Sequence, residues 1–292
     1  MPRLSLHELL RRESPLLLPV AHDALSARLI ARAGFLAASI GGFGIAGCRF
    51  GLPDLGLASF GELSASVRDI ANATSLPLIV DADDGYGDVK NVVRTVRTYE
   101  GMGVSAIVLE DQASPKKCGH MEVERRIVPA WEAESKLRAA LDARMDSAFG
   151  VIARTDARSL EGIEAALDRA RGYAAVGVDA LFIEAPRSIE ELRLIGRSFE
   201  LPLVVNAAEG GRTPLLSPVE YRDLGFSLIL YPSTLLLRMV AVLRRTLAAL
   251  REGRFAREEE MPDFRDLADL MGLTEWIGFD QRFGRKDPPP PQ

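Results

Sequence analysis

The sequence predicts an α/β protein built as one (β/α)8 TIM barrel, and three observations lead to this fold class. The chain has 292 residues, and a barrel of this kind takes roughly 250. Short apolar runs alternate with helical patterns along most of the chain. No linker divides it, and its 47% of hydrophobic residues is enough for a single large core.

Eight apolar runs rich in β-branched residues are the predicted strands. In chain order they are Leu16–Val20, Leu36–Ile40, Leu78–Asp81, Ala106–Glu110, Phe149–Ala153, Ala180–Glu184, Leu203–Asn206 and Ser227–Tyr231. Continuous apolar strands that alternate with helices indicate a parallel sheet buried on both faces. The alternative, an open doubly wound sheet, needs a Gly-rich phosphate turn after the first strand. The chain has Ala21, His22 and Asp23 there, which favours the barrel.

Several helix boundaries can be placed between these strands. Ser59 and Glu62 have the spacing of a capping box. Ser217 followed by Pro218 is typical of an N-cap and the first helical residue. Glycines stand where helices should end before the next strand, at Gly34, Gly103 and Gly177.

We predict three segments along the chain. Residues 1–255 form the barrel, residues 256–283 form a helical extension, and residues 284–292 form a disordered tail. The tail contains Pro288 to Pro291, and such a run of prolines does not sustain a helix.

The predicted eighth helix, Leu235–Leu250, carries apolar residues on more than the single stripe that one barrel would bury. Packing the second face against another subunit would remove an exposed apolar surface. The pattern therefore predicts an oligomer. The alternative is a monomer in which Phe264, Leu267 and Leu270 of the same chain cover this helix.

Composition excludes several classes of partner. The net charge of -5 gives no reason to expect binding to nucleic acid. No apolar run approaches the roughly 20 residues that span a membrane. Charges occupy the N-terminal stretch where an export signal would be apolar. Two cysteines are too few for a disulfide scaffold, so we expect a reducing cytoplasm.

Polar residues end most of the predicted strands. They are Asp81, Glu110, Arg154, Glu184, Asn206 and Tyr231. In a closed barrel the carboxyl ends of the strands meet on one face, where barrel enzymes have their active sites. We therefore expect these side chains to surround one site.

Three carboxylates predict a metal site on this face. Asp81 and Asp83 are two residues apart, so an extended backbone would point both the same way, and Glu110 follows the neighbouring strand. Three carboxylates held together repel one another unless a cation joins them. Oxygen ligands favour Mg²⁺, with Mn²⁺ possible. The alternative is a structural network in which these acids pair with Arg154 and lysines.

The segment that follows the fourth strand contains Lys116, Lys117, Cys118, Gly119 and His120 and has no apolar periodicity. Long loops at the mouth of a barrel are often lids. A thiol beside lysines and a histidine should have a lowered pKa, which suits proton transfer. The alternative is that Cys118 is an inert apolar residue.

Together these residues resemble the signature of the isocitrate lyase and phosphoenolpyruvate mutase superfamily. The matching segments are residues 51–56, 81–87, 110–112, 116–120, 152–157 and 209–214, with Asn206 and the pair Tyr231 and Pro232. They lie in order between about residues 15 and 250, and similarity is greatest to the short members. These are methylisocitrate lyase, dimethylmalate lyase, oxaloacetate hydrolase and carboxyphosphonoenolpyruvate mutase.

The resemblance implies a (β/α)8 barrel whose eighth helix is swapped between subunits of a homodimer or homotetramer. It implies Mg²⁺ near Asp81, Asp83 and Glu110, with Asp54 close to the metal. Roles in binding or converting a small carboxylic acid substrate fall on Arg154, Glu184, Asn206, Lys116, Gly119, Cys118 and His120. Cys118 matches the lid cysteine that handles a proton in the lyases.

The chain departs from the lyase pattern at two positions. Gly41 stands where many lyases have a serine, so only backbone N–H groups at Gly41 and Gly42 remain to bind a keto acid. Ala208 stands near a threonine of methylisocitrate lyase, and its hydroxyl is absent here. Both differences weaken an assignment to methylisocitrate in particular.

The predicted activity is that of a Mg²⁺-dependent carbon–carbon lyase. It would cleave a methylisocitrate- or dimethylmalate-like 2-hydroxy di- or tricarboxylate to a 2-keto acid and a second carboxylic acid. A phosphonomutase acting on a carboxyphosphonoenolpyruvate-like substrate and an oxaloacetate hydrolase are alternatives that use the same site. A non-catalytic barrel that only binds partners is a third.

Overall fold

The computed structural model describes residues 4–117, 124–255 and 261–284. The chain forms two compact units, Met1–Val240 and Ala241–Gln292. The first unit contains the whole barrel, and the helix α11 continues from the first unit into the second. Among the helices of the described ranges, none combines the length and the apolar content that crossing a membrane requires.

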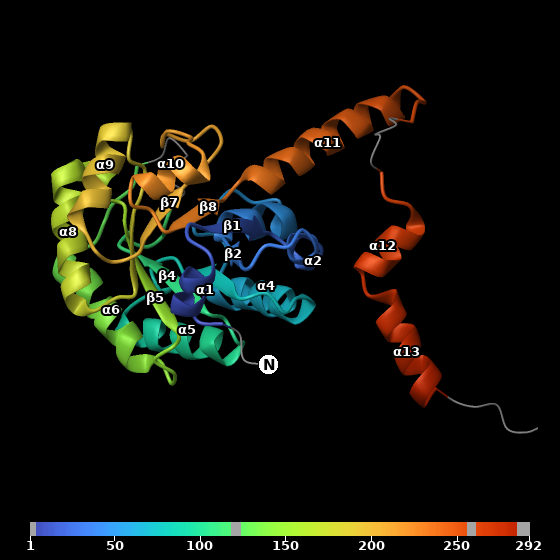
Figure 1. Cartoon of the computed structure of the whole chain (residues 1–292), viewed down its shortest axis with the longest axis horizontal. Coiled ribbons are helices and arrows are strands. Elements are labelled where there is room, and N and C mark those ends of the chain that lie inside the picture. The colour runs from blue at the N-terminus through green and yellow to red at the C-terminus, as the bar shows by residue number, and fades with distance from the viewer. Residues whose placement is uncertain (1–3, 118–123, 256–260, 285–292) are drawn as a thin grey trace, which may run out of the picture. The chain divides into compact units, whose positions relative to one another are not determined.

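The first unit is a closed barrel of parallel strands that follow one another in chain order, as predicted (Figure 1). The strands are β1 (Leu16–Ala21), β2 (Ala38–Ile40), β3 (Leu78–Asp81), β4 (Ala106–Glu110), β5 (Gly150–Thr155), β6 (Ala180–Ile183), β7 (Leu203–Asn206) and β8 (Leu228–Tyr231). Pairing of β1 with β8 closes the barrel, with Leu16 opposite Leu228.

Helices surround the strands of this unit (Figure 1). They are α1 (Leu6–Arg12), α2 (Ala24–Arg32), α3 (Gly42–Ile45), the π-helix η1 (Ala46–Phe50), α4 (Phe60–Ala73), α5 (Val89–Gly101), α6 (Ala130–Ala143), α7 (Ala157–Glu161), α8 (Ile163–Val176), α9 (Ile189–Ser198) and α10 (Pro218–Asp223). The N-cap predictions hold, because the Ser59 hydroxyl accepts from the Glu62 amide and the Ser217 hydroxyl from the Glu220 amide.

The inward-facing residues of β4 and β5 are apolar along most of each strand and charged near its carboxyl end. Side chains of a strand alternate between the two faces, so every second residue points inward. In β4 the inward series is Ala106, Val108 and Glu110, and in β5 it includes Ile152 and Arg154. Apolar residues therefore fill the barrel interior, and the last inward position at the carboxyl end is charged.

The amino-terminal end of the barrel is closed by α1. Leu6 and Leu9 of this helix are fully buried and pack against the interior apolar cluster. Gly150, at the start of β5, makes room for them, since a Cβ atom there would lie 2.9 Å from the Ala106 Cβ and 3.3 Å from the Leu6 Cβ. Because side chains fill the amino-terminal end, the carboxyl end is the one available for an active site.

The second unit consists of the end of α11 (Thr234–Arg251), then α12 (Phe264–Leu270) and α13 (Leu273–Phe283). The helix predicted at Leu235–Leu250 corresponds to α11. The described part of the predicted tail is Gly284 alone, so the prediction of a disordered tail lies almost wholly outside the described residues.

Candidate active site

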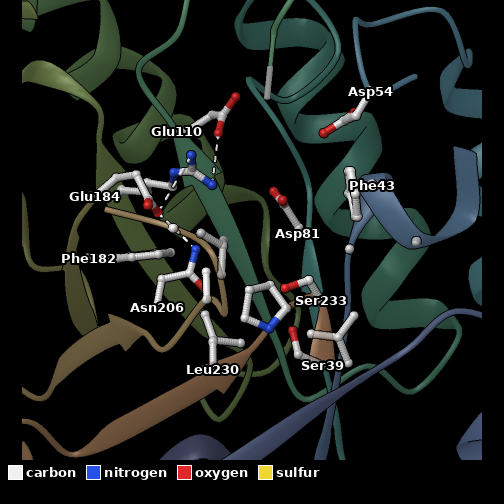
Figure 2. Close-up of a pocket in the computed structure, with 18 of the residues that line it drawn as sticks. Ser39, Phe43, Asp54, Asp81, Glu110, Phe182, Glu184, Asn206, Leu230 and Ser233 are labelled. Atoms are coloured by element: carbon white, nitrogen blue, oxygen red, sulfur yellow. Dashed lines mark hydrogen bonds and ion pairs between the residues drawn. The ribbon is translucent and has the colours of Figure 1, made fainter. Parts of the chain in front are cut away.

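A cavity of about 220 Å³ opens at the carboxyl ends of the strands. Eight residues named from the sequence as site residues line its wall: Gly41, Asp54, Asp81, Glu110, Lys116, Arg154, Glu184 and Asn206. Lys117 also lines it, whereas Gly42 and Asp83, which were named as well, are not among the lining residues. Figure 2 shows Asp54 and Glu184 on opposite sides of the cavity, with Asp81 between them. Of the polar residues expected to surround one space, Asp81, Glu110, Arg154, Glu184 and Asn206 line this cavity, whereas Tyr231 is not among the lining residues.

One side of the cavity, which we call the acidic side, gathers Asp54, Asp81 and Asp83 around Lys116. The Lys116 Nζ lies 2.6 Å from the Asp83 Oδ1 and 3.2 Å from the Asp54 Oδ1. A Cβ atom at Gly42 would lie 3.3 Å from this Nζ and 3.7 Å from oxygens of both aspartates. Glycine at position 42 therefore lets the backbone that begins α3 approach the charged cluster.

The expected geometry of Asp83 needs a correction. An extended backbone was expected to point Asp81 and Asp83 the same way, but β3 ends at Asp81 and Asp83 has φ 50°. The Asp83 amide donates to the Asp81 Oδ1 at 3.1 Å, which stabilises this turn. Asp83 reaches the acidic side through the turn rather than through strand alternation. Asp84 faces away and pairs with the buried Lys136 at 3.4 Å.

The opposite side, which we call the arginine side, is built around Arg154. Its Nε donates to the Asp156 Oδ2 at 2.9 Å, and its Nη2 donates to the Asp156 Oδ1 at 3.2 Å. The Arg154 Nη1 lies 3.3 Å from the Glu110 Oε2, and its Nη2 lies 3.7 Å from the Glu184 Oε2. The contact between Arg154 and Glu110 follows from strand register, since these two residues are paired across β4 and β5.

Glu184 and Asn206 form a second polar pair on the arginine side. The Asn206 Nδ2 donates to the Glu184 Oε2 at 3.2 Å. Within the described ranges, the Glu184 Oε1, the Asn206 Oδ1 and the Glu110 Oε1 are buried without a hydrogen-bond partner. Buried acceptors without donors are rare in folded proteins. These three atoms therefore indicate that a ligand with donor groups or positive charge belongs in the cavity.

Burial dominates the protonation behaviour of these groups. It raises the pKa of Glu110 well above its usual range, although Arg154 opposes the shift. It also raises the pKa of Asp83 to about 7, against the opposing effect of Lys116. For Lys116, burial lowers the pKa, but Asp83, Asp81 and Asp54 together outweigh it and hold the ammonium charged. Glu110 and Asp83 are thus costly to ionise without positive charge nearby.

The described residues contain no preformed group of three acid, histidine or cysteine side chains in metal-binding geometry. The arrangement matches the alternative network instead, because Lys116 lies between Asp54 and Asp83 while Glu110 contacts Arg154. The residues nevertheless fit a divalent cation. All candidate ligands are oxygens, the preference of Mg²⁺. One ammonium also balances only part of the charge of three aspartates.

Comparison with known proteins places this barrel in a family. The family model described as phosphoenolpyruvate phosphomutase matches residues 6–251. The chain belongs to the isocitrate lyase and phosphoenolpyruvate mutase superfamily. It is 40% identical over 272 residues to 2,3-dimethylmalate lyase of Eubacterium barkeri, covering 92% of this chain and 94% of that protein.

Two solved structures of the superfamily are similar along nearly their whole length. Oxaloacetate acetylhydrolase in complex with the inhibitor 3,3-difluorooxalacetate has a TM-score of 0.91 and 32% identity, covering 97% of both chains. Phosphonopyruvate hydrolase in complex with oxalate and Mg²⁺ has a TM-score of 0.82 and 28% identity, covering 92% of this chain and 94% of that one. The chain is therefore an enzyme of this superfamily, and its lyase relatives support carbon–carbon lyase activity.

Part of the superfamily signature cannot be placed. Cys118, Gly119 and His120 lie outside the described residues, so the predicted proton donor and its neighbours remain predictions. The residues before them are placed. Lys116 is on the acidic side, and Lys117 Nζ donates to the Glu124 carbonyl at 2.7 Å.

Ser39, Phe182 and Phe43 are among the lining residues that were not predicted as site residues from the sequence. Ser39 lines the cavity and donates to the Ile79 carbonyl at 2.9 Å, so a serine does stand on β2, two positions before Gly41. The Phe182 ring lies under the Arg154 guanidinium, 5.2 Å from centroid to Cζ. Phe43 supplies an apolar wall opposite (Figure 2). Strand alternation would have identified Phe182, because it lies on β6 and Glu184, two residues later, directly follows that strand.

Proposed function

We propose that this enzyme is a Mg²⁺-dependent carbon–carbon lyase acting on a small 2-hydroxy di- or tricarboxylate of the dimethylmalate or methylisocitrate type. Its products would be a 2-keto acid and a second carboxylic acid. One observation carries the proposal: the cavity has aspartates on one side and a buried, charged arginine on the other. The identity to 2,3-dimethylmalate lyase supports the same reaction type.

We propose that the metal lies on the acidic side, with Glu110 reaching it from the arginine side. Asp54, Asp81, Asp83 and Glu110 would hold one Mg²⁺, directly or through water. When bound, the ion supplies positive charge that polarises hydroxyl and carboxylate oxygens and stabilises the negative charge that develops as the bond breaks. The complex of phosphonopyruvate hydrolase with oxalate and Mg²⁺ supports this choice of metal.

The other residues would bind substrate and move protons. Arg154 can hold a substrate carboxylate through two parallel hydrogen bonds. The Glu184 Oε1 is a buried acceptor toward which the 2-hydroxyl can release its proton. The carbon–carbon bond then breaks, and its electron pair moves onto a carboxylate-stabilised enolate. Cys118 would donate a proton to that enolate, the step for which its basic neighbours suit it.

A substrate screen tests this proposal. Dimethylmalate, methylisocitrate, isocitrate, oxaloacetate and phosphonopyruvate are each incubated with metal-free enzyme and with enzyme restored with Mg²⁺, and the keto acid is quantified. We expect Mg²⁺-dependent keto acid formation from dimethylmalate or methylisocitrate. Turnover of phosphonopyruvate alone would reassign the site to phosphonate chemistry. No turnover of any compound in Mg²⁺ would contradict the proposal.

Oxaloacetate hydrolysis is the second candidate, and the likeness to oxaloacetate acetylhydrolase favours it. In that reaction water attacks a keto group in the same cavity. The screen separates the two activities by their products, since hydrolysis of oxaloacetate yields oxalate and acetate and leaves no keto acid. Oxalate formation that is faster than any lyase reaction would make hydrolysis the main activity.

We also propose that the enzyme is a homodimer or homotetramer that exchanges α11. Leu243, Leu247 and Leu250 of this helix are exposed even within their own unit. Either another subunit or the rest of the same chain must cover such a surface. Light scattering at micromolar concentration decides between these possibilities. We expect a mass of at least twice 31.8 kDa, and a constant monomer mass as concentration rises would exclude exchange.

A further inference from the structure

The carboxylate that holds Arg154 is shared with a second arginine. Asp156 is fully buried. Its Oδ1 accepts from the Arg154 Nη2 at 3.2 Å and from the Arg125 Nη1 at 3.1 Å. Its Oδ2 accepts from the Arg154 Nε at 2.9 Å. One oxygen therefore bridges the two guanidinium groups, and Arg125 is part of the same charged unit as Arg154.

Arg125 is held in place from two directions. Its Nη2 donates to the Ser159 hydroxyl at 3.2 Å while its Nη1 reaches Asp156. Only 6% of the Arg125 side chain is exposed. The planar guanidinium thus contacts both Asp156, the residue that precedes α7, and Ser159 within α7, and a point charge such as that of lysine could not reproduce both contacts fully.

A charge count explains why Arg154 benefits from a second cation. Asp156, Glu110 and Glu184 all surround Arg154, so three acids compete for one guanidinium. An incoming substrate carboxylate would be a fourth. By sharing the charge of Asp156, Arg125 weakens the pull of Asp156 on Arg154. More of the positive charge of Arg154 is then directed to the cavity.

We propose that Arg125 is a positioning residue. Through Asp156, it keeps the Arg154 guanidinium at the wall of the cavity, where it is available to a substrate carboxylate. Without Arg125, the undivided charge of Asp156 would draw Arg154 into a closer two-bond pair, away from the cavity. The binding part of this inference rests on the proposed role of Arg154. Its structural part, the position of the guanidinium, does not.

Two measurements on Arg125→Met test the inference. The first is a crystal structure without ligand, in which Arg154 should withdraw from Glu110 and its Nη1 to Oε2 distance should exceed the present 3.3 Å. The second is calorimetric titration with oxalate in saturating Mg²⁺. We expect about ten-fold weaker oxalate binding, the order of effect of one hydrogen bond to a charged group. For an active substrate, KM should rise more than kcat falls.

Arg144→Met is the matched control. The Arg144 Nη1 also pairs with a largely buried carboxylate, the Asp179 Oδ2, at 3.1 Å, but Asp179 accepts from the Val151 amide and contacts neither Arg154 nor Asp156. We expect comparable losses of stability in the two variants and an oxalate affinity that falls only in Arg125→Met. Equal losses of affinity in both would reduce Arg125 to a structural role.

Conservative variants keep the test decisive if Arg125→Met does not fold. Arg125→Lys should bind oxalate more weakly than the wild type, but by less than about ten-fold, because an ammonium can still share part of the charge of Asp156. Ser159→Ala, which removes only the second anchor of Arg125, should also weaken oxalate binding by less than about ten-fold. Wild-type oxalate affinity in both variants, with Arg154 in its wild-type position in both crystals, would overturn the inference.

Discussion

On the acidic side of the cavity three aspartates share one lysine, whereas on the arginine side one arginine is surrounded by three acids. Both sides contain an excess of negative charge. They differ in how the cation is held: Lys116 contributes a single ammonium, and Arg154 is anchored by two bonds to a fully buried carboxylate. A compact ammonium can be displaced by a metal ion more easily than an anchored guanidinium.

This difference assigns separate tasks to the two sides. The acidic side suits a cation that exchanges with solvent, and the arginine side suits repeated capture of an anionic substrate. Variants on the acidic side should therefore alter metal affinity, and variants of Arg154 and its aromatic neighbour should alter substrate affinity; Glu110, which contacts Arg154 and is also a proposed metal ligand, is the one residue expected to affect both. An Arg154 or Asp83 variant that weakens metal binding and substrate binding equally would contradict this separation.

The largest effect is expected at Cys118, which follows the lysine of the acidic side by two residues. Cys118→Ser should reduce kcat by about 10²–10⁴-fold, the usual contribution of a group that transfers a proton. Mg²⁺ affinity should not change, because the thiol is not a proposed ligand. Turnover close to that of the wild type would show that Cys118 is not the proton donor.

Arg154→Lys should affect only the arginine side. The variant keeps the positive charge but loses the two parallel bonds, and kcat/KM should fall about 10- to 100-fold, the order expected for one or two hydrogen bonds between charged groups. Steady-state kinetics at saturating Mg²⁺ measures this loss. Calorimetric Mg²⁺ titration should give the wild-type affinity, and weaker Mg²⁺ binding would show that the two sides are coupled.

Asp83→Asn is the corresponding test of the acidic side. Removing one carboxylate should weaken Mg²⁺ binding by at least about 10- to 100-fold, the loss usual for residues that support a metal site without contacting the ion directly. Asp84→Asn is the control, since Asp84 is an equally buried neighbour that pairs with Lys136. Unchanged Mg²⁺ affinity in Asp83→Asn would favour a structural network of acids and lysine over a metal site.

Much of the fold could be predicted because polar residues mark the strand ends. For β3, β4 and β7 the predicted boundaries are those of the structure, and each of these strands ends at a polar residue that follows an apolar run. The second strand was predicted too long, beginning at Leu36, whereas β2 begins at Ala38. Leu36 is apolar but precedes the sheet, and an apolar pattern does not distinguish these two situations.

The site was harder to predict where contacts join distant segments. Lys116 lies 62 residues after Asp54, and no local pattern shows that its ammonium would reach that carboxylate. The sharing of Asp156 by Arg125 and Arg154 is invisible for the same reason. Asp83 was misjudged because its left-handed backbone breaks the alternation on which the prediction depended.

The smallest effect is expected from Phe182→Leu on the arginine side. The aromatic ring lies 5.2 Å from the Arg154 Cζ, and such a cation–π contact contributes about 0.5–2 kcal/mol, more when it is shielded from water. Leucine keeps the apolar contact but removes the ring, so we expect KM or the Kd for oxalate to rise roughly three- to ten-fold. Mg²⁺ affinity should stay at the wild-type value.

Phe226→Leu separates this effect from a general loss of packing. Phe226 is also buried, and its ring packs edge-on against Tyr221, with ring centroids 6.2 Å apart. Both variants should lower the urea midpoint of unfolding, because each removes part of a buried ring. Only Phe182→Leu should weaken oxalate binding. If both weaken it equally, the ring of Phe182 stabilises the barrel as a whole, and Arg154 is positioned by its carboxylate partners alone.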